Sequence, residues 1–206
     1  WAALVGYAAA VAPNAGADAD AALIQTLLAP PAEALANANG VFYALFNVMG
    51  VWPAVYAALL VPSRGRGGDG APPAWPFVVG SFALGAFALM PYFALTLNGE
   101  PDAEQPPEQE RTLAVRVLES KAFAASLLAS TAALGAVAAN AVVSTGGGAW
   151  DEYLQLFGSV KLVNVTSVDF LTLSLWAPFW CARDAERRGA DAPGALTAVP
   201  IIGFGK

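Results

Sequence analysis

The sequence predicts an all-α integral membrane protein with about four transmembrane helices and short interfacial helices. Two observations support this prediction. First, 57% of the 206 residues are hydrophobic and only 13% are charged, and the mean hydropathy is +0.53; soluble globular domains contain about 25% charged residues. Second, the charged residues leave long charge-free stretches between them. A helix that crosses a bilayer needs about 20 mostly apolar residues, and several of these stretches are long enough.

Four stretches meet this requirement. The first three contain no charged residue, whereas the fourth contains one, Asp169. The spans are expected at about 40–61, 75–97, 122–143 and 162–182. We expect a single membrane domain over 1–206, with 1–35 as a peripheral N-terminal segment because its apolar runs are too short to cross.

Two segments have the composition of short helices at the membrane surface. Asp18–Leu28 is expected to form a short amphipathic helical segment that lies on the surface. Trp150–Val160 is expected to be a second interfacial helix, because large apolar side chains recur along it at helical spacing. In that helix we expect four side chains to face lipid: Trp150, Tyr153, Leu154 and Phe157.

Positive charges near the ends of spans indicate which face is cytoplasmic. With four spans, both termini share a face with 98–121. That face holds seven basic residues, namely Arg111, Arg116, Lys121, Arg183, Arg187, Arg188 and Lys206. The other face holds three, Arg64, Arg66 and Lys161. We therefore expect both termini on the cytoplasmic face or its organellar equivalent, although Arg64 and Arg66 oppose this orientation.

Small residues repeat along two of the predicted spans. The third span has Ala125, Ala129 and Ala133 at four-residue spacing, and the second has a similar group, Gly80, Ser81 and Gly85. Small side chains let helix backbones approach closely in lipid. These residues either pack the chain's own helices together or form a surface that docks a larger partner or a pigment.

Asp169 is the one acidic residue inside a predicted span. Ionisable groups within a membrane are costly, and they mark a functional site unless they are paired. Three interpretations remain open. Asp169 could relay protons or cations, or it could pair with a base such as Lys161. Alternatively, the helix could begin later in the sequence, so that Asp169 lies at its N-terminus.

The composition excludes several kinds of chemistry. The chain has no histidine and a single cysteine, Cys181, so it offers no Ser-His-Asp or Cys-His catalytic set, no axial histidine for haem, no histidine-zinc site and no protein-only iron–sulfur site. We expect no haem, zinc or iron–sulfur cofactor. We therefore expect no enzyme activity. The formal charge of −6 argues against a nucleic-acid partner. The remaining oxygen donors near the membrane include Asn47, Glu119 and Asn140, which could bind the magnesium of chlorophyll or form hydrogen bonds between helices.

Three segments resemble a known family: Asn39–Pro53, Pro76–Phe93, and Val163–Trp180 with the Arg183-Asp184 and Arg187-Arg188-Gly189 that follow. Together they are similar to the first, second and closing segments of a poorly characterised membrane family of cyanobacteria and plastids. The resemblance does not extend to 1–35 or to the third span. It implies a location in the thylakoid membrane of an oxygenic phototroph, with both termini in the stroma.

The expected function follows from this resemblance and from the lack of a catalytic set. We expect an accessory subunit that docks light-harvesting antenna to the photosystem I core in a red-lineage alga. Chlorophyll or carotenoid could be held at its interfaces, and membrane lipids are expected partners. Two alternatives stay open, namely a small transporter or channel that uses Asp169, and a transient photosystem assembly factor.

Overall fold

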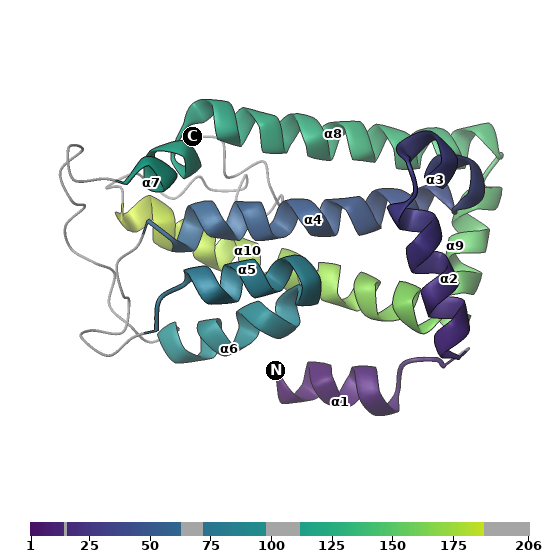
Figure 1. Cartoon of the computed structure of the whole chain (residues 1–206), viewed down its shortest axis with the longest axis horizontal. Coiled ribbons are helices and arrows are strands. Elements are labelled where there is room, and N and C mark those ends of the chain that lie inside the picture. The colour runs from purple at the N-terminus through teal and green to yellow at the C-terminus, as the bar shows by residue number, and fades with distance from the viewer. Residues whose placement is uncertain (15, 63–71, 98–111, 188–206) are drawn as a thin grey trace. The chain divides into compact units, whose positions relative to one another are not determined.

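The computed structural model describes residues 1–14, 16–62, 72–97 and 112–187, and every regular element in these ranges is a helix (Figure 1). This confirms the all-α prediction. The ten helices are α1 (Ala2–Ala10), α2 (Ala17–Leu28), α3 (Pro31–Asn37), α4 (Gly40–Leu60), α5 (Trp75–Leu84), α6 (Ala86–Thr96), α7 (Leu113–Leu118), α8 (Lys121–Ser144), α9 (Gly148–Ser159) and α10 (Lys161–Arg187).

Three of these helices, α4, α8 and α10, are long and apolar enough to cross a membrane. They coincide with the spans expected at 40–61, 122–143 and 162–182. Length and composition therefore suggest a multi-pass membrane protein. The predicted surface helix at Asp18–Leu28 corresponds to α2, and the one at Trp150–Val160 corresponds to α9.

The structure differs from the sequence prediction at 75–97. Instead of one continuous helix it has two short ones, α5 and α6, which turn back on each other as a hairpin (Figure 1). Gly85 forms the turn with φ +51° and ψ −129°, a backbone conformation that side chains other than glycine rarely adopt. The Phe77 and Tyr92 rings, 5.4 Å apart, pack across the hairpin. Apolar composition alone cannot reveal such a turn, because both arms are as hydrophobic as a straight span.

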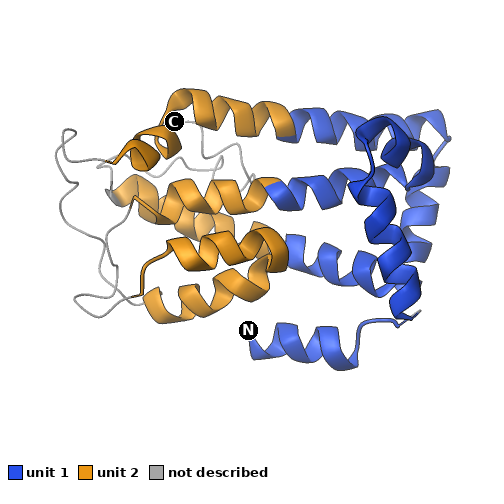
Figure 2. Cartoon of the chain, viewed as in Figure 1, with its two compact units in different colours: residues 1–50, 131–171 blue, residues 51–130, 172–206 orange. Residues whose placement is uncertain are grey.

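Backbone contacts divide the chain into two compact units, coloured separately in Figure 2. Unit 1 comprises 1–50 and 131–171, and unit 2 comprises 51–130 and 172–206. Unit 1 has a core that draws on the N-terminal helices as well as on α4, α9 and α10. Its buried members are Leu27, Ala34, Val41, Phe42, Tyr43, Ala149, Tyr153 and Val163.

Tyr153 is one of these core residues, although the sequence analysis placed it toward lipid. Its side chain is 8% exposed, and its hydroxyl lies 2.9 Å from Ser167 Oγ on α10. Trp150 and Leu154, on the same helix, are 46% and 48% exposed. The polar tip of Tyr153 explains the difference, because a buried hydroxyl needs a hydrogen-bond partner and α10 supplies one.

Unit 2 has a core of aromatic rings that pack against one another at tilted angles. Phe93 on α6 packs against Trp180 and Trp176 of α10, with ring centroids 4.9 and 5.9 Å away, and against Tyr56 of α4 at 5.3 Å. The Tyr56 hydroxyl donates a 2.6 Å hydrogen bond to the Leu173 carbonyl. This bond satisfies the polar end of a buried ring, so the three helices meet through both ring contact and hydrogen bonding.

Gly40 allows α4 and α8 to approach closely within unit 1. A Cβ atom at Gly40 would lie 2.6 Å from the Cβ of Ala141, which is too close for two carbon atoms. Ala141 cannot rotate its methyl group away because that carbon is attached directly to the α8 backbone. A larger residue at position 40 therefore forces the two helices apart.

Replacing Gly40 with alanine should destabilise the protein. Overpacking a close contact costs about 1–3 kcal/mol, so the Gly40→Ala variant should unfold at a lower temperature in detergent. Gly50→Ala is the matched control, because Gly50 lies in the same helix and a Cβ atom there would meet nothing within 4 Å. Equal melting temperatures for the two variants would contradict the proposed close contact.

Candidate functional site

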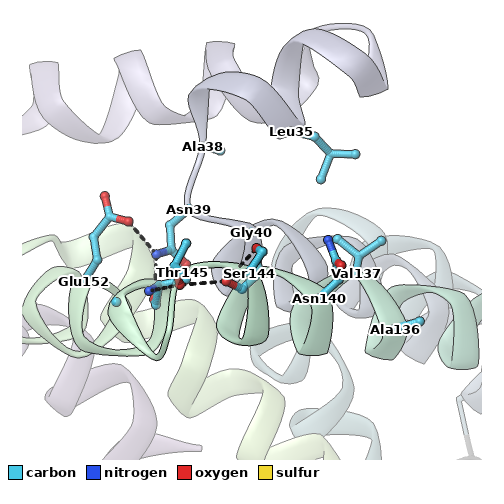
Figure 3. Close-up of a pocket in the computed structure, with 13 residues that line it drawn as sticks. Leu35, Ala38, Asn39, Gly40, Ala136, Val137, Asn140, Ser144, Thr145 and Glu152 are labelled. Atoms are coloured by element: carbon cyan, nitrogen blue, oxygen red, sulfur yellow. Dashed lines mark hydrogen bonds between the residues drawn. The ribbon is translucent and has the colours of Figure 1, made fainter.

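A pocket with mainly apolar walls lies in unit 1 where α3 leads into α4, beside the C-terminal half of α8 and the start of α9 (Figure 3). Its volume is about 790 Å³. Its walls combine apolar side chains with a few amide, hydroxyl and carboxylate groups. The lining residues are Leu35, Ala38, Asn39, Gly40, Ala136, Val137, Asn140, Ala141, Ser144, Thr145, Gly148, Ala149 and Glu152.

Asn39 organises one side of this pocket. Its side-chain oxygen accepts hydrogen bonds from the backbone N–H groups of Val41 and Phe42, each at 3.0 Å, and so caps the N-terminus of α4. Its amide nitrogen donates to the Ala149 carbonyl and to Glu152 Oε2, each at 2.8 Å. Figure 3 shows Asn39 and Glu152 pointing toward each other. All the bonding capacity of the Asn39 side chain is used, so its role here is structural.

Sequence reasoning missed both Asn39 and Glu152 as pocket residues. An asparagine directly before a long apolar run is a recognised helix-start signal, which could have identified Asn39 as a cap. Glu152 gave no comparable signal. It follows Asn39 by more than a hundred positions, and only the tertiary structure brings the two together.

The three candidate pigment ligands have different surroundings. Asn140 is exposed on α8 and lines the pocket, so its amide is accessible to a ligand. Asn47 is half-buried in α4, and its amide nitrogen donates to the Tyr43 carbonyl of the same helix at 2.8 Å. Glu119 is the residue that caps the C-terminus of α7. Within the described ranges, no cluster of Cys, Asp or Glu side chains could hold a metal ion.

Asp169 lies well inside α10 and is only 5% exposed. The helix begins at Lys161, so the interpretation that it begins later, with Asp169 at its N-terminus, is wrong. The relay and pairing interpretations stay predictions. Two polar residues close to Asp169 in the sequence, Asn164 and Ser167, are also buried, with side chains 4% and 3% exposed.

Hydrogen bonds at the start of α10 connect this helix to other elements of unit 1. Asn164 accepts a 2.7 Å hydrogen bond from the Tyr7 hydroxyl of α1 and donates one of 3.0 Å to the Phe157 carbonyl of α9. Asp20 of α2 accepts a 3.0 Å bond from the Leu162 N–H at the start of α10. A carboxylate there also complements the positive end of the helix dipole. The first turns of α10 thus anchor the N-terminal helices.

The two groups of small residues have different surroundings: one lies within the α5–α6 hairpin and the other is exposed on α8. Gly80 packs within the hairpin, where a Cβ would meet the Ala88 methyl at 3.4 Å, and Ser81 is buried with its hydroxyl bonded to the Val78 carbonyl. Gly85 is the hairpin turn. In contrast, Ala125, Ala129 and Ala133 are all exposed on α8. No helix among the described residues covers this stripe.

Comparisons with models of protein families, with curated proteins and with solved structures found no match for this chain.

Removing the Asn39 side chain should destabilise α4 and loosen the pocket. Loss of a helix N-cap costs about 0.5–2 kcal/mol, so Asn39→Ala should lower the melting temperature in detergent. Asn37→Ala is the control, since Asn37 is exposed and its amide bonds only the Glu33 carbonyl within α3. If the two variants melt together, the capping role assigned to Asn39 is wrong.

Proposed function

We propose that this protein is a non-catalytic accessory subunit of a photosynthetic membrane complex, and that it docks light-harvesting antenna to the core of photosystem I in the thylakoid membrane. The observation that supports docking most strongly is the exposure of α8. In its most apolar window only 6% of the residues are buried, against 61% for α4.

The composition of the exposed surface favours a protein partner over lipid alone. A lipid-facing helix is satisfied by any large apolar side chains, whereas small residues at four-residue spacing let a neighbouring helix come close. Ala125, Ala129 and Ala133 provide such a stripe on the most exposed long helix. The photosynthetic context comes from the resemblance of Asn39–Pro53, Pro76–Phe93 and Val163–Trp180 to the family of cyanobacteria and plastids.

The pocket beside Asn140 supports an associated pigment. Chlorophyll magnesium is a hard cation that accepts an amide oxygen as ligand, and Asn140 is the candidate among the three whose amide is exposed on the pocket wall. The exposed apolar surface of α8 suits the tail of chlorophyll, a carotenoid or lipid. In this proposal the chain contributes binding surfaces and no catalytic residue.

Native-gel electrophoresis of the tagged protein, purified in mild detergent, tests the docking proposal. We expect it to migrate in stoichiometric amounts with a chlorophyll-containing photosystem, as shown by the absorption spectrum and protein composition of the band. Substoichiometric amounts would indicate an assembly factor instead. A colourless band of the protein alone would contradict the proposal and favour a transporter or channel that uses Asp169.

Enlarging the α8 stripe should weaken this association. Ala129→Leu places a bulky side chain where a partner helix would approach, so the variant should lose most of its co-migration with the complex. Ser130→Leu adds similar bulk at an exposed position turned about 100° around the helix. Equal loss of co-migration in the two variants would show that the stripe has no special role.

Replacing Asn140 with leucine should reduce the pigment that co-purifies with the protein. The substitution removes the amide oxygen but keeps a side chain of similar size. We expect less chlorophyll per protein in the absorption spectrum, with unchanged accumulation. Asn47→Leu is the comparison, because the Asn47 amide already bonds within α4. If only Asn47→Leu loses chlorophyll, the assignment to Asn140 is wrong.

A further inference from the structure

We propose that the α5–α6 hairpin is re-entrant: it enters the bilayer from one face, turns near the middle, and returns to the same face. Its outer surface would then contact the acyl chains of a single leaflet. This inference concerns how the chain is threaded through the membrane, and it does not depend on the proposed function.

The length of each arm matches half a bilayer. The α5 helix has 10 residues and α6 has 11, which at 1.5 Å per residue gives arms of about 15–17 Å. The hydrocarbon core of a bilayer is about 30 Å thick. Neither arm is long enough to cross, and each is long enough to reach the middle.

Backbone hydrogen bonds hold the turn, and a turn within hydrocarbon requires such bonds. The Gly85 N–H donates to the Ser81 carbonyl at 2.8 Å, and the Gly85 carbonyl accepts from the N–H groups of Ala88 and Leu89 at 3.2 and 3.4 Å. No charged residue lies between Trp75 and Thr96. The hairpin therefore has no charged side chain to place in lipid, and hydrogen bonds of its own backbone hold the turn.

The outer surface of the hairpin is strongly apolar. Large hydrophobic side chains on both arms are about 60% exposed, a pattern that suits contact with acyl chains and not with water. They are Trp75, Val79, Phe82, Leu84 and Leu95, at 61, 62, 60, 59 and 62%. Trp75 stands at the open end of the hairpin, the depth at which tryptophan prefers to lie in a membrane.

Contacts within unit 2 place the open end of the hairpin beside the C-terminal part of α10. Arg183 donates a 3.1 Å hydrogen bond to the carbonyl of Leu97, which caps α6, and its guanidinium lies 5.1 Å from the centre of the Phe179 ring. Phe93, one helical turn before Leu97, packs on Trp180. The arms therefore point from the basic end of α10 back along the helix.

The charge distribution supports the same threading. If α4, α8 and α10 cross and the hairpin does not, chain connectivity puts the segments after α4, between α6 and α8, and after α10 on one face. Nine of the ten basic residues then share that face: Arg64, Arg66, Arg111, Arg116, Lys121, Arg183, Arg187, Arg188 and Lys206. Lys161 alone is on the other.

Four crossings would divide the same residues seven to three and leave Arg64 and Arg66 on the wrong face. The three-crossing arrangement obeys the positive-inside rule without this conflict. It replaces the expectation that both ends of the chain face the stroma: with three crossings, chain connectivity puts the segments before α4 and between α8 and α10 on the face opposite to the nine basic residues.

Labelling of single cysteines in sealed vesicles tests this threading. In a Cys181→Ala background, cysteines are introduced at exposed positions on either side of the hairpin, Pro73→Cys and Ala114→Cys, and on α9, Gln155→Cys. With a membrane-impermeant maleimide we expect the first two to be labelled from the same face and the third from the opposite face. Labelling of Pro73→Cys and Ala114→Cys from opposite faces would overturn the proposal, because the hairpin would then cross.

A cysteine near the turn tests the depth of the hairpin. Leu84→Cys should resist maleimide from both faces while the membrane is intact, because the thiolate that attacks maleimide does not form in hydrocarbon, and it should react once the protein is denatured in SDS. Labelling by the impermeant reagent from the basic face would show that the hairpin lies on the membrane surface, which also overturns the proposal. Phe82→Cys repeats the measurement on the same arm if Leu84→Cys does not accumulate, and wild-type protein gives the background from buried Cys181.

Discussion

Backbone N–H and C=O groups in hydrocarbon must find hydrogen-bond partners within the protein, and this constraint governs where the helices begin, end and turn. Within a helix the requirement is met automatically, whereas helix ends need outside help. Asn39 caps α4 with its side-chain oxygen, and Asp20 accepts an N–H at the start of α10. At Gly85 the turn bonds its own neighbours. These three ends are therefore satisfied in three different ways: by a side-chain cap, by a carboxylate from another helix and by backbone bonds within the turn.

Hydropathy could predict the helices that are defined by one continuous stretch of apolar sequence. The helices α4, α8 and α10 follow from apolar runs of sufficient length, because a crossing helix needs nothing else to be recognised. The break at Gly85 was not predictable in this way. From the sequence, Gly85 was predicted to be a small residue at a helix-packing surface. In the structure its important property is the positive φ that allows the chain to reverse direction.

The candidate site was harder to predict because its contacts join distant parts of the sequence. Asn140 was one of three candidate oxygen donors in the sequence, and only the structure shows that it lies exposed on a pocket wall. Asn39 and Glu152 meet there without any sequence pattern that relates them. Tyr153 was assigned to lipid from its helical spacing, and its bond to Ser167 shows that one polar atom can reverse the orientation of a ring.

A hairpin confined to one leaflet also has a mechanical consequence. The hairpin then takes up area in the leaflet on the basic side and none in the leaflet beyond its turn. Lipids next to the short arms on either side of Gly85 must tilt or redistribute to fill this unequal space, so the bilayer is locally strained there.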